Sequence, residues 1–225
     1  MTFSIAARCP RTGMLGVAVS SSSIGVTSRC AHVRPRVGAA LSQNVTDPAL
    51  GSHMLDFVQG GLDGPAALDR VVAAEHQPQW RQLVIVPLRG TPAIHTGANA
   101  LGVSAQALGG DCASAGNLLA DPAIPRIMVD AFETSRGHLA DRLLAALRAA
   151  VVAGGEAGPL HAAGLMVADA VSWPVIDLRV DWSEAADPVG ELEVLWRLYR
   201  PQLHAYVERA RDPDKGPSYG VPGDP

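Results

Sequence analysis

Positive charge is scarce in this sequence, and lysine is almost absent. Charged residues make up 18% of the 225 residues, the formal net charge is −4, and a single lysine, Lys215, stands near the end. Nucleic acids and anionic membrane surfaces are bound through clustered Lys and Arg. No such cluster occurs, so we expect neither a nucleic-acid partner nor a membrane partner.

Cysteine and long apolar runs are also scarce. The three cysteines, Cys9, Cys30 and Cys112, have no CxxC spacing, and the seven histidines are dispersed without HxH or HxxxH spacing. These patterns indicate neither a disulfide framework nor a metal site. No run approaches the ~18 apolar residues that cross a bilayer, and no signal-peptide pattern opens the chain. We expect a cytoplasmic protein without a metal.

Aliphatic residues are abundant and must fill the core. Hydrophobic residues are 48% of the chain although aromatics are only 4%. This composition and length predict one globular domain over residues 1–211. The remaining residues, 212–225, are rich in Pro and Gly, which predicts a flexible tail.

Apolar periodicity and turn residues predict the order of the elements. The expected elements are a hairpin over 2–21, a strand over Arg36–Gln43, two helices between Pro48 and Glu75, a hairpin from strands 80–88 and 91–97, a poorly defined segment over Ala98–Asn117 holding loop and a short strand, helices Pro122–Ser135 and His138–Val152, strands 162–170 and 175–182, and a helix over Pro188–Arg209. Strands in hairpins and helices in pairs are typical of an α+β domain. One layered solution is a four-layer αββα sandwich of two antiparallel sheets.

A resemblance follows from these segments taken in order. The stretches "TFSIAARCPRTGMLGVAVSS", "RVGAALSQNVTDPALG", "RQLVIVP" with "HTG", "AGNLLADP", and "WPVIDLRVD" followed by "DPVGELEVLWRLYR" run to about Arg200. Together they resemble the bacterial domain-of-unknown-function family 1028, whose fold is related to the N-terminal-nucleophile (Ntn) hydrolases. The resemblance implies an Ntn-like αββα fold and, through it, hydrolysis of an amide without a metal or organic cofactor.

Thr2 is the residue that such a reaction needs. An Ntn hydrolase uses the side chain of its first residue as nucleophile and the α-amine of that residue as base. An α-amine with a pKa of about 8 can take up and return a proton near neutral pH. Threonine is small enough for methionine aminopeptidase to remove the preceding Met1, which exposes Thr2 as the N-terminal residue. The alternative is that Thr2 only begins a strand. If Met1 is retained, the nitrogen of Thr2 is an amide and cannot act as the base.

Further candidates accompany Thr2. Arg34 matches the arginine of the family and is expected to tune the nucleophile, although a solvated arginine at a strand entrance is the alternative. Ser4, two residues beyond Thr2, shares its sheet face. Ser4 is expected to form a hydrogen bond near the nucleophile and to bind substrate, although packing or surface polarity explains Ser4 equally well. In the polar stretch Ser42-Gln43-Asn44, at the end of the third strand, Ser42 and Asn44 are expected to bind substrate.

An oxyanion hole is the remaining requirement. Gly116 and Asn117 offer a close backbone approach and an amide donor, although Asn117 is alternatively the cap of the following helix. Asp177, on a predicted strand, either binds substrate and orients Arg34 or pairs along the sheet. The chain departs from the family pattern where small or apolar residues replace polar and aromatic ones, at Ala100, Val103, Cys112 and Leu160.

The resemblance therefore implies an amidohydrolase that cleaves a non-peptide or small-peptide C–N bond of a small-molecule amide, with Thr2 as nucleophile after removal of Met1. The departures leave open an inactive Ntn-like protein that binds a ligand or serves as a scaffold. Cys112 is the alternative nucleophile, although burial as a small hydrophobic residue is the more common role of such a cysteine. The C-terminal helix, with Leu192, Leu195, Trp196 and Tyr199, either packs within the chain or forms the face of a homodimer.

Overall fold

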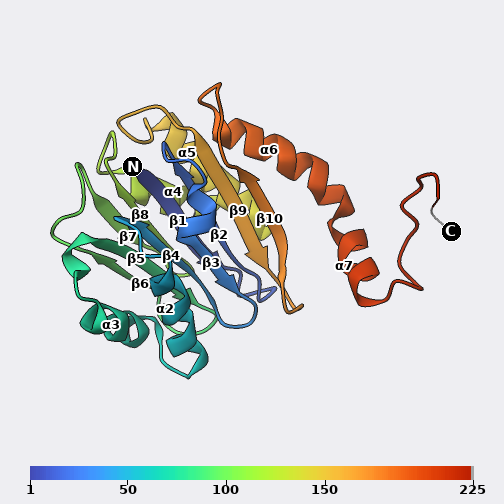
Figure 1. The fold of residues 1–225 in the computed structure, drawn as a ribbon, viewed down its shortest axis with the longest axis horizontal. Coiled ribbons are helices and arrows are strands. Elements are labelled where there is room, and N and C mark those ends of the chain that lie inside the picture. Colours follow the sequence, from blue (N-terminus) through green and yellow to red (C-terminus); the bar gives the residue numbers. More distant parts are fainter. Residues whose placement is uncertain (224–225) are drawn as a thin grey trace.

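Two antiparallel sheets organise the chain, of which the computed structural model describes residues 1–223 (Figure 1). The six-stranded sheet has the order β10 (Pro174–Val180), β9 (Ala162–Ala168), β2 (Leu15–Ser21), β1 (Thr2–Arg8), β8 (Cys112–Asn117) and β7 (Ala105–Leu108). The four-stranded sheet has the order β3 (Ala31–Arg34), β4 (Gly38–Asn44), β5 (Arg81–Pro87) and β6 (Ala93–Thr96). The expected α+β class is confirmed at this level.

The outer face of the six-stranded sheet is covered by α4 (Ile124–Thr134), α5 (Leu139–Val152) and α6 (Pro188–Tyr199), and that of the four-stranded sheet by α2 (Ala49–Gln59) and α3 (Gly64–Ala74). The short helix α1 (Val26–Cys30) contributes instead to the core between the sheets. Helix α7 (Leu203–Arg211) follows α6, and 3₁₀ turns lie at Pro78–Trp80 and Arg200–Gln202. Capping is local: the Asp63 side chain accepts the Ala66 N–H at the start of α3, and His138 forms a capping box with Asp141 at the start of α5.

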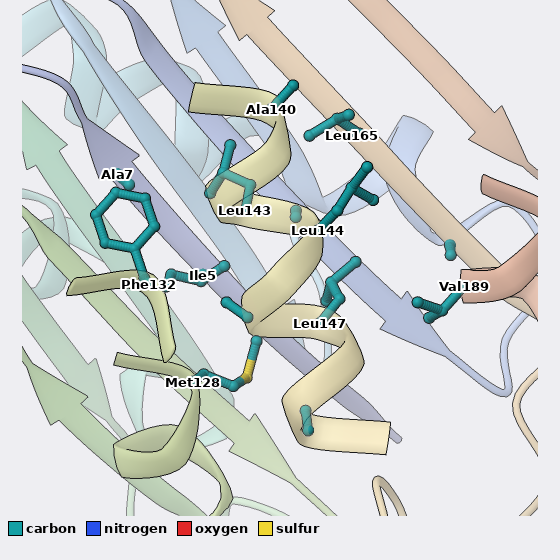
Figure 2. Packing of buried hydrophobic residues seen from close by; sticks show 14 of the residues in the cluster. Ile5, Ala7, Met128, Phe132, Ala140, Leu143, Leu144, Leu147, Leu165 and Val189 are labelled. Atoms are coloured by element: carbon teal, nitrogen blue, oxygen red, sulfur yellow. The ribbon is translucent and has the colours of Figure 1, made fainter. Parts of the chain in front are cut away.

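The largest core lies between the six-stranded sheet and helices α4, α5 and α6. Figure 2 shows Ile5 and Ala7 of β1 against Met128 and Phe132 of α4 and Leu143 of α5. Alternate residues of β1 face this side, since Phe3, Ile5 and Ala7 all belong to it. Thr2, Ser4 and Ala6 therefore face the opposite way.

Two smaller cores complete the packing. Residues such as Ala6, Val17, Leu41 and Val84 fill the space between the two sheets. A third cluster joins the outer face of the four-stranded sheet to α2 and α3, for example through Met54. The inter-sheet layer is aliphatic along most of β1, but it becomes polar at the end where Thr2 lies.

Several elements differ from the sequence expectation. Residues 98–117 contain both β7 and β8 within the main sheet, so the expectation of loop with one short strand was wrong there. Small Ala, Gly and Ser side chains have weak strand propensity, and pairing with β1 overrides it. The expected helix 188–209 is interrupted at Arg200–Gln202, where Pro201 cannot continue the ladder of hydrogen bonds.

Helix α6 of the C-terminal part packs within the chain. Leu192 and Trp196 of α6 are buried in the main core, and Leu195 and Tyr199 pack against it. Part of the predicted tail folds back on α7: the Arg209 guanidinium of α7 stacks on Tyr219 of the tail, 3.7 Å from the ring centroid, and donates to the Pro217 carbonyl. Residues 224–225 of that tail lie outside the described residues. In residues 1–223 no helix has the length and apolar character needed to cross a membrane.

Candidate functional site

Thr2 begins β1 and is 6% exposed. It pairs directly with Asn117 on β8, and the β1–β2 register places it beside Ser21. Side chains of directly opposed residues share one face of a sheet, so Thr2, Asn117 and Ser21 all face the inter-sheet layer. The Thr2 Oγ1 lies 3.4 Å from the Ser21 Oγ.

Met1 occupies the space beside this trio. The hydroxyls of Thr2 and Ser21 both donate to the Met1 carbonyl oxygen. The Met1 side chain reaches Gly158: a Cβ built at that glycine would lie 3.1 Å from the Met1 Cε. With Met1 attached, the nitrogen of Thr2 is an amide and has no basic lone pair.

A buried chain of amides lies behind Thr2, between the sheets. In the side-chain amide of Gln82, on β5, both the nitrogen and the oxygen have hydrogen-bond partners. The Nε2 donates to the Gly116 carbonyl (3.0 Å) and to Thr96. The Oε1 accepts from Gln43 (2.8 Å) and Asn117 (3.2 Å). Gln43 Nε2 also donates to the Ala115 carbonyl, 3.2 Å away. Ser4 donates to Gln43 Oε1, 2.5 Å away.

This network fixes how Asn117 is oriented. A backbone carbonyl only accepts, so the Gly116 carbonyl requires the Nε2 of Gln82 to face it, and the Oε1 of Gln82 must face Asn117. Asn117 therefore turns its NH₂ to Gln82 and leaves its Oδ1 buried without a hydrogen-bond partner among the described residues. It is not the helix cap that we weighed: the Asp121 carboxylate accepts the Ala123 N–H before α4.

Gly116 lies within β8 rather than in a turn. It pairs with Phe3 on one side and with Ala105 on the other, and a Cβ built there would lie 2.6 Å from Leu119 Cδ2. Its carbonyl accepts from Gln82. The geometry thus gives this glycine a packing and anchoring function beside Asn117.

Glu156 was not anticipated from the sequence. It is 4% exposed, and neither of its carboxyl oxygens has a hydrogen-bond partner in residues 1–223. Burial raises its pKa to about 7; the positive N-terminal amine and the nearby Ser22 oppose the rise. The residue follows Gly154-Gly155 in a loop, and no periodic pattern marks it.

The backbone holds Glu156 next to Asn117. Glu156 bridges to Leu119, the Ala120 N–H donates to the Gly155 carbonyl (3.0 Å), and the Ala157 N–H donates to the Leu118 carbonyl (2.9 Å). These contacts attach the 155–157 loop to the chain just after β8. The buried carboxyl group is therefore a fixed part of the Thr2 end of the sheets.

Two of the predicted site residues, Arg34 and Asp177, do not lie at the end of the sheets where Thr2 lies. Arg34 pairs with Gly38, at the far end of β4 from Asn44, and binds Asp56 and Gln59 of α2. Arg8 marks that far end of β1 by donating to the Pro87 carbonyl, and Pro87 pairs with Gly38. At about 3.3 Å per residue along seven-residue β1, Arg34 lies on the order of 20 Å from Thr2, and the geometry gives no support to the expected tuning role.

Asp177 is likewise distant from Thr2. It lies exposed on the edge strand β10, with β9 and β2 between it and β1. Asp177 pairs with Met166, Met166 pairs with Val17, and Val17 pairs with Ala6. Across the sheet, Asp177 is therefore aligned with Ala6 and not with Thr2. The geometry therefore leaves Asp177 outside the candidate site.

The remaining predicted polar residues have mixed placements. Ser4 faces the inter-sheet network, as expected from its spacing with Thr2. Ser42 faces the helix side and donates to the Asp47 carbonyl, 2.7 Å away. Asn44, with φ +71°, connects two loops at the Thr2 end, donating to the Trp80 carbonyl and accepting the Leu101 N–H.

The positions that depart from the family pattern lie partly at this end. The Val103 carbonyl accepts the Leu119 N–H, and Leu160 precedes His161, whose N–H donates to the Ser21 carbonyl. Ala100 lies in the same loop as Val103. Cys112 is fully buried, and burial raises the pKa of its thiol to about 12. A thiol with that pKa stays protonated at neutral pH, which makes Cys112 a poor alternative nucleophile.

Comparison with known proteins gives a family match and a structural match. The model of a family of unknown function, DUF1028, matches residues 2–192. Among solved structures, the crystal structure of protein SPO2555 from Silicibacter pomeroyi, described by the same family model, is 29% identical, with a TM-score of 0.82. The alignment covers 88% of this chain and 88% of that chain. No curated protein matches.

Proposed function

The chain belongs to the DUF1028 family, and we propose that it is an Ntn-type hydrolase of amides in which Thr2 is the nucleophile once Met1 has been removed. One observation carries the proposal: Thr2 begins a buried strand, and its hydroxyl lies in the buried polar cluster between the sheets, beside Ser21 and Asn117. The αββα layering and the relationship to Ntn hydrolases are part of this proposal. The three separate cores support it, since each joins one pair of layers.

The mechanism assigns a task to each group. Thr2 Oγ1 attacks the amide carbonyl, its proton passes to the free α-amine of Thr2, and the amine returns it to the leaving nitrogen as the C–N bond breaks. Water then attacks the resulting ester, which releases a carboxylate and restores the hydroxyl. The reaction uses no metal or organic cofactor, and its partner is a small-molecule amide.

The charge that develops on the carbonyl oxygen needs a donor. Ser21 Oγ already donates to the carbonyl oxygen of Met1, the carbonyl next to Thr2. We therefore assign this role to Ser21 rather than to Gly116 and Asn117, because the Asn117 NH₂ is turned to Gln82 and the Gly116 carbonyl is an acceptor. Asn117 Oδ1 is the unoccupied acceptor opposite Thr2. It suits the N–H of the Thr2 amine, which orients the base.

The first experiment determines the N-terminus. Intact-protein mass spectrometry of the purified chain is expected to show loss of Met1. A β-lactone probe is then expected to label wild type and Thr2→Ser, but not the nearly isosteric Thr2→Val. Quantitative retention of Met1, or undiminished labelling of Thr2→Val, contradicts the proposal.

A second candidate is a ligand-binding or scaffold protein without catalysis. The observation in its favour is that none of the five cavities described in residues 1–223 is lined by Thr2, Ser21 or Glu156. Retention of Met1 supports this candidate, and labelling of Thr2 argues against it.

A further inference from the structure

Met1 is held at the site in the way that an acyl group would be held. Its carbonyl oxygen accepts hydrogen bonds from Thr2 and Ser21, and its side chain lies against Gly158. Moving the methionyl group from the Thr2 nitrogen to the Thr2 oxygen, its near neighbour, gives the ester of the proposed mechanism. Met1 therefore indicates where the acyl part of a substrate lies and which groups surround it.

The amino group of Met1 faces an unusual environment. Glu156 is buried, and its two carboxyl oxygens have no partner among the described residues. A buried carboxyl group without a partner is costly, and a bound cation or hydrogen-bond donor offsets that cost. The positive N-terminal amine is close enough to lower the pKa of this carboxyl, against the effect of burial. Removing Met1 removes that amine and leaves the buried Glu156 carboxyl without this neighbouring positive charge.

We propose that Glu156 binds the α-ammonium group of the substrate, and that this chain therefore hydrolyses amides whose acyl part is an α-amino acid with a free amino group. Such substrates are amino acid amides and the N-terminal residues of short peptides. The inference rests on the proposed function and specifies its substrate class. Each turnover cleaves one amide bond with one water, releasing a free amino acid and an amine.

Gly158 sets the space for the substrate side chain. It shows no left-handed φ, so a side chain there causes no backbone strain, but its Cβ would lie 3.1 Å from the Cε and 3.5 Å from the Sδ of Met1. A larger residue at this position narrows the space that a methionyl side chain fills. It leaves room for an alanyl group.

The test uses protein whose N-terminal Thr2 has been verified by mass spectrometry. The substrates are L-methionine p-nitroanilide, its N-acetyl derivative, and the des-amino analogue 4-(methylthio)butanoyl p-nitroanilide. We expect kcat/KM for the free-amino substrate to exceed that of the other two by at least about tenfold, the size of one charged hydrogen bond. In Glu156→Gln this preference is expected to fall by about tenfold, and in the exposed control Glu208→Gln to stay unchanged.

A second variant keeps the test decisive if Glu156→Gln does not fold. Gly158→Val is expected to lower kcat/KM for L-methionine p-nitroanilide relative to L-alanine p-nitroanilide by about tenfold, as steric discrimination in a pocket allows. Gly110→Val is the matched control, since a Cβ at Gly110 meets nothing within 4 Å.

The outcomes separate this inference from the proposed function. If the β-lactone probe labels Thr2, the inference alone is overturned by any of three results: no hydrolysis of L-methionine p-nitroanilide, equal or faster hydrolysis of the des-amino or N-acetyl substrate, or an unchanged preference in Glu156→Gln. If Thr2 is neither labelled nor required for hydrolysis, both the inference and the proposed function fail.

Discussion

At the scale of single residues, Gln82 organises the inter-sheet polar network. It is fully buried and makes four hydrogen bonds, to Thr96, Gly116, Gln43 and Asn117. In Gln82→Met the last three partners keep buried polar atoms that lose a hydrogen bond. We expect the free energy of unfolding, measured with urea, to fall by at least about 2 kcal/mol.

The matched control for Gln82 is the exposed Gln59, which contacts the Arg34 side chain. Gln59→Met is expected to change the free energy of unfolding by no more than about 0.5 kcal/mol. Equal effects of the two substitutions would show that the buried amides do not stabilise the junction of the sheets.

Part of the candidate site could be predicted from the sequence. Thr2, Ser4 and Asn117 converge because strand alternation and pairing are local rules. The same alternation explains why Gln43 faces the other sheet while Ser42 faces the helices. Glu156 gave no such signal, since its position depends on a loop that contacts residues 118–120 from another part of the chain.

At the scale of elements, close approach of the short helix α1 to β9 depends on a glycine. A Cβ built at Gly164 would lie 1.9 Å from Thr27 Oγ1 and 2.7 Å from Thr27 Cβ, and Thr27 is itself 1% exposed. We expect Gly164→Ala to lower the free energy of unfolding by about 1–3 kcal/mol, the usual effect of overpacking. Gly110→Ala, which has open space around it, should be close to neutral in the same urea titration, and a neutral Gly164→Ala would contradict this packing.

The predictability of the elements followed the strength of their periodicity. Helices α2 to α5 and strands β9 and β10 lie close to the expected ranges because their apolar spacing is regular. The five-residue α1 and the four-residue β3 carry too few residues to show a period. β8 is made of Cys, Ala, Ser, Gly and Asn, and only its pairing with β1 and β7 makes it a strand.

At the scale of the whole molecule, the last helices differ in what they contribute. α6 supplies Val189, Leu192 and Trp196 to the main core, and the family match ends at residue 192, within α6. α7 has no buried residue and contacts that core only through the partly buried Leu203 and Val207. In Figure 1 α7 and the tail extend away from the sheets, on the side opposite the N-terminus.

Truncation tests this division. A chain ending at residue 202 keeps α6, including the hydrogen bond from the Trp196 indole to Asp141 and that from the Tyr199 hydroxyl to the Val175 carbonyl. We expect its Tm to fall by less than about 5 °C, because a loss of about 1 kcal/mol moves the Tm of a domain this size by only about 2–4 °C. A chain ending at residue 187 loses the buried α6 side chains and is expected not to fold cooperatively. Thermal unfolding followed by circular dichroism distinguishes the two, and a similar Tm for both would mean that α6 adds little to the main core.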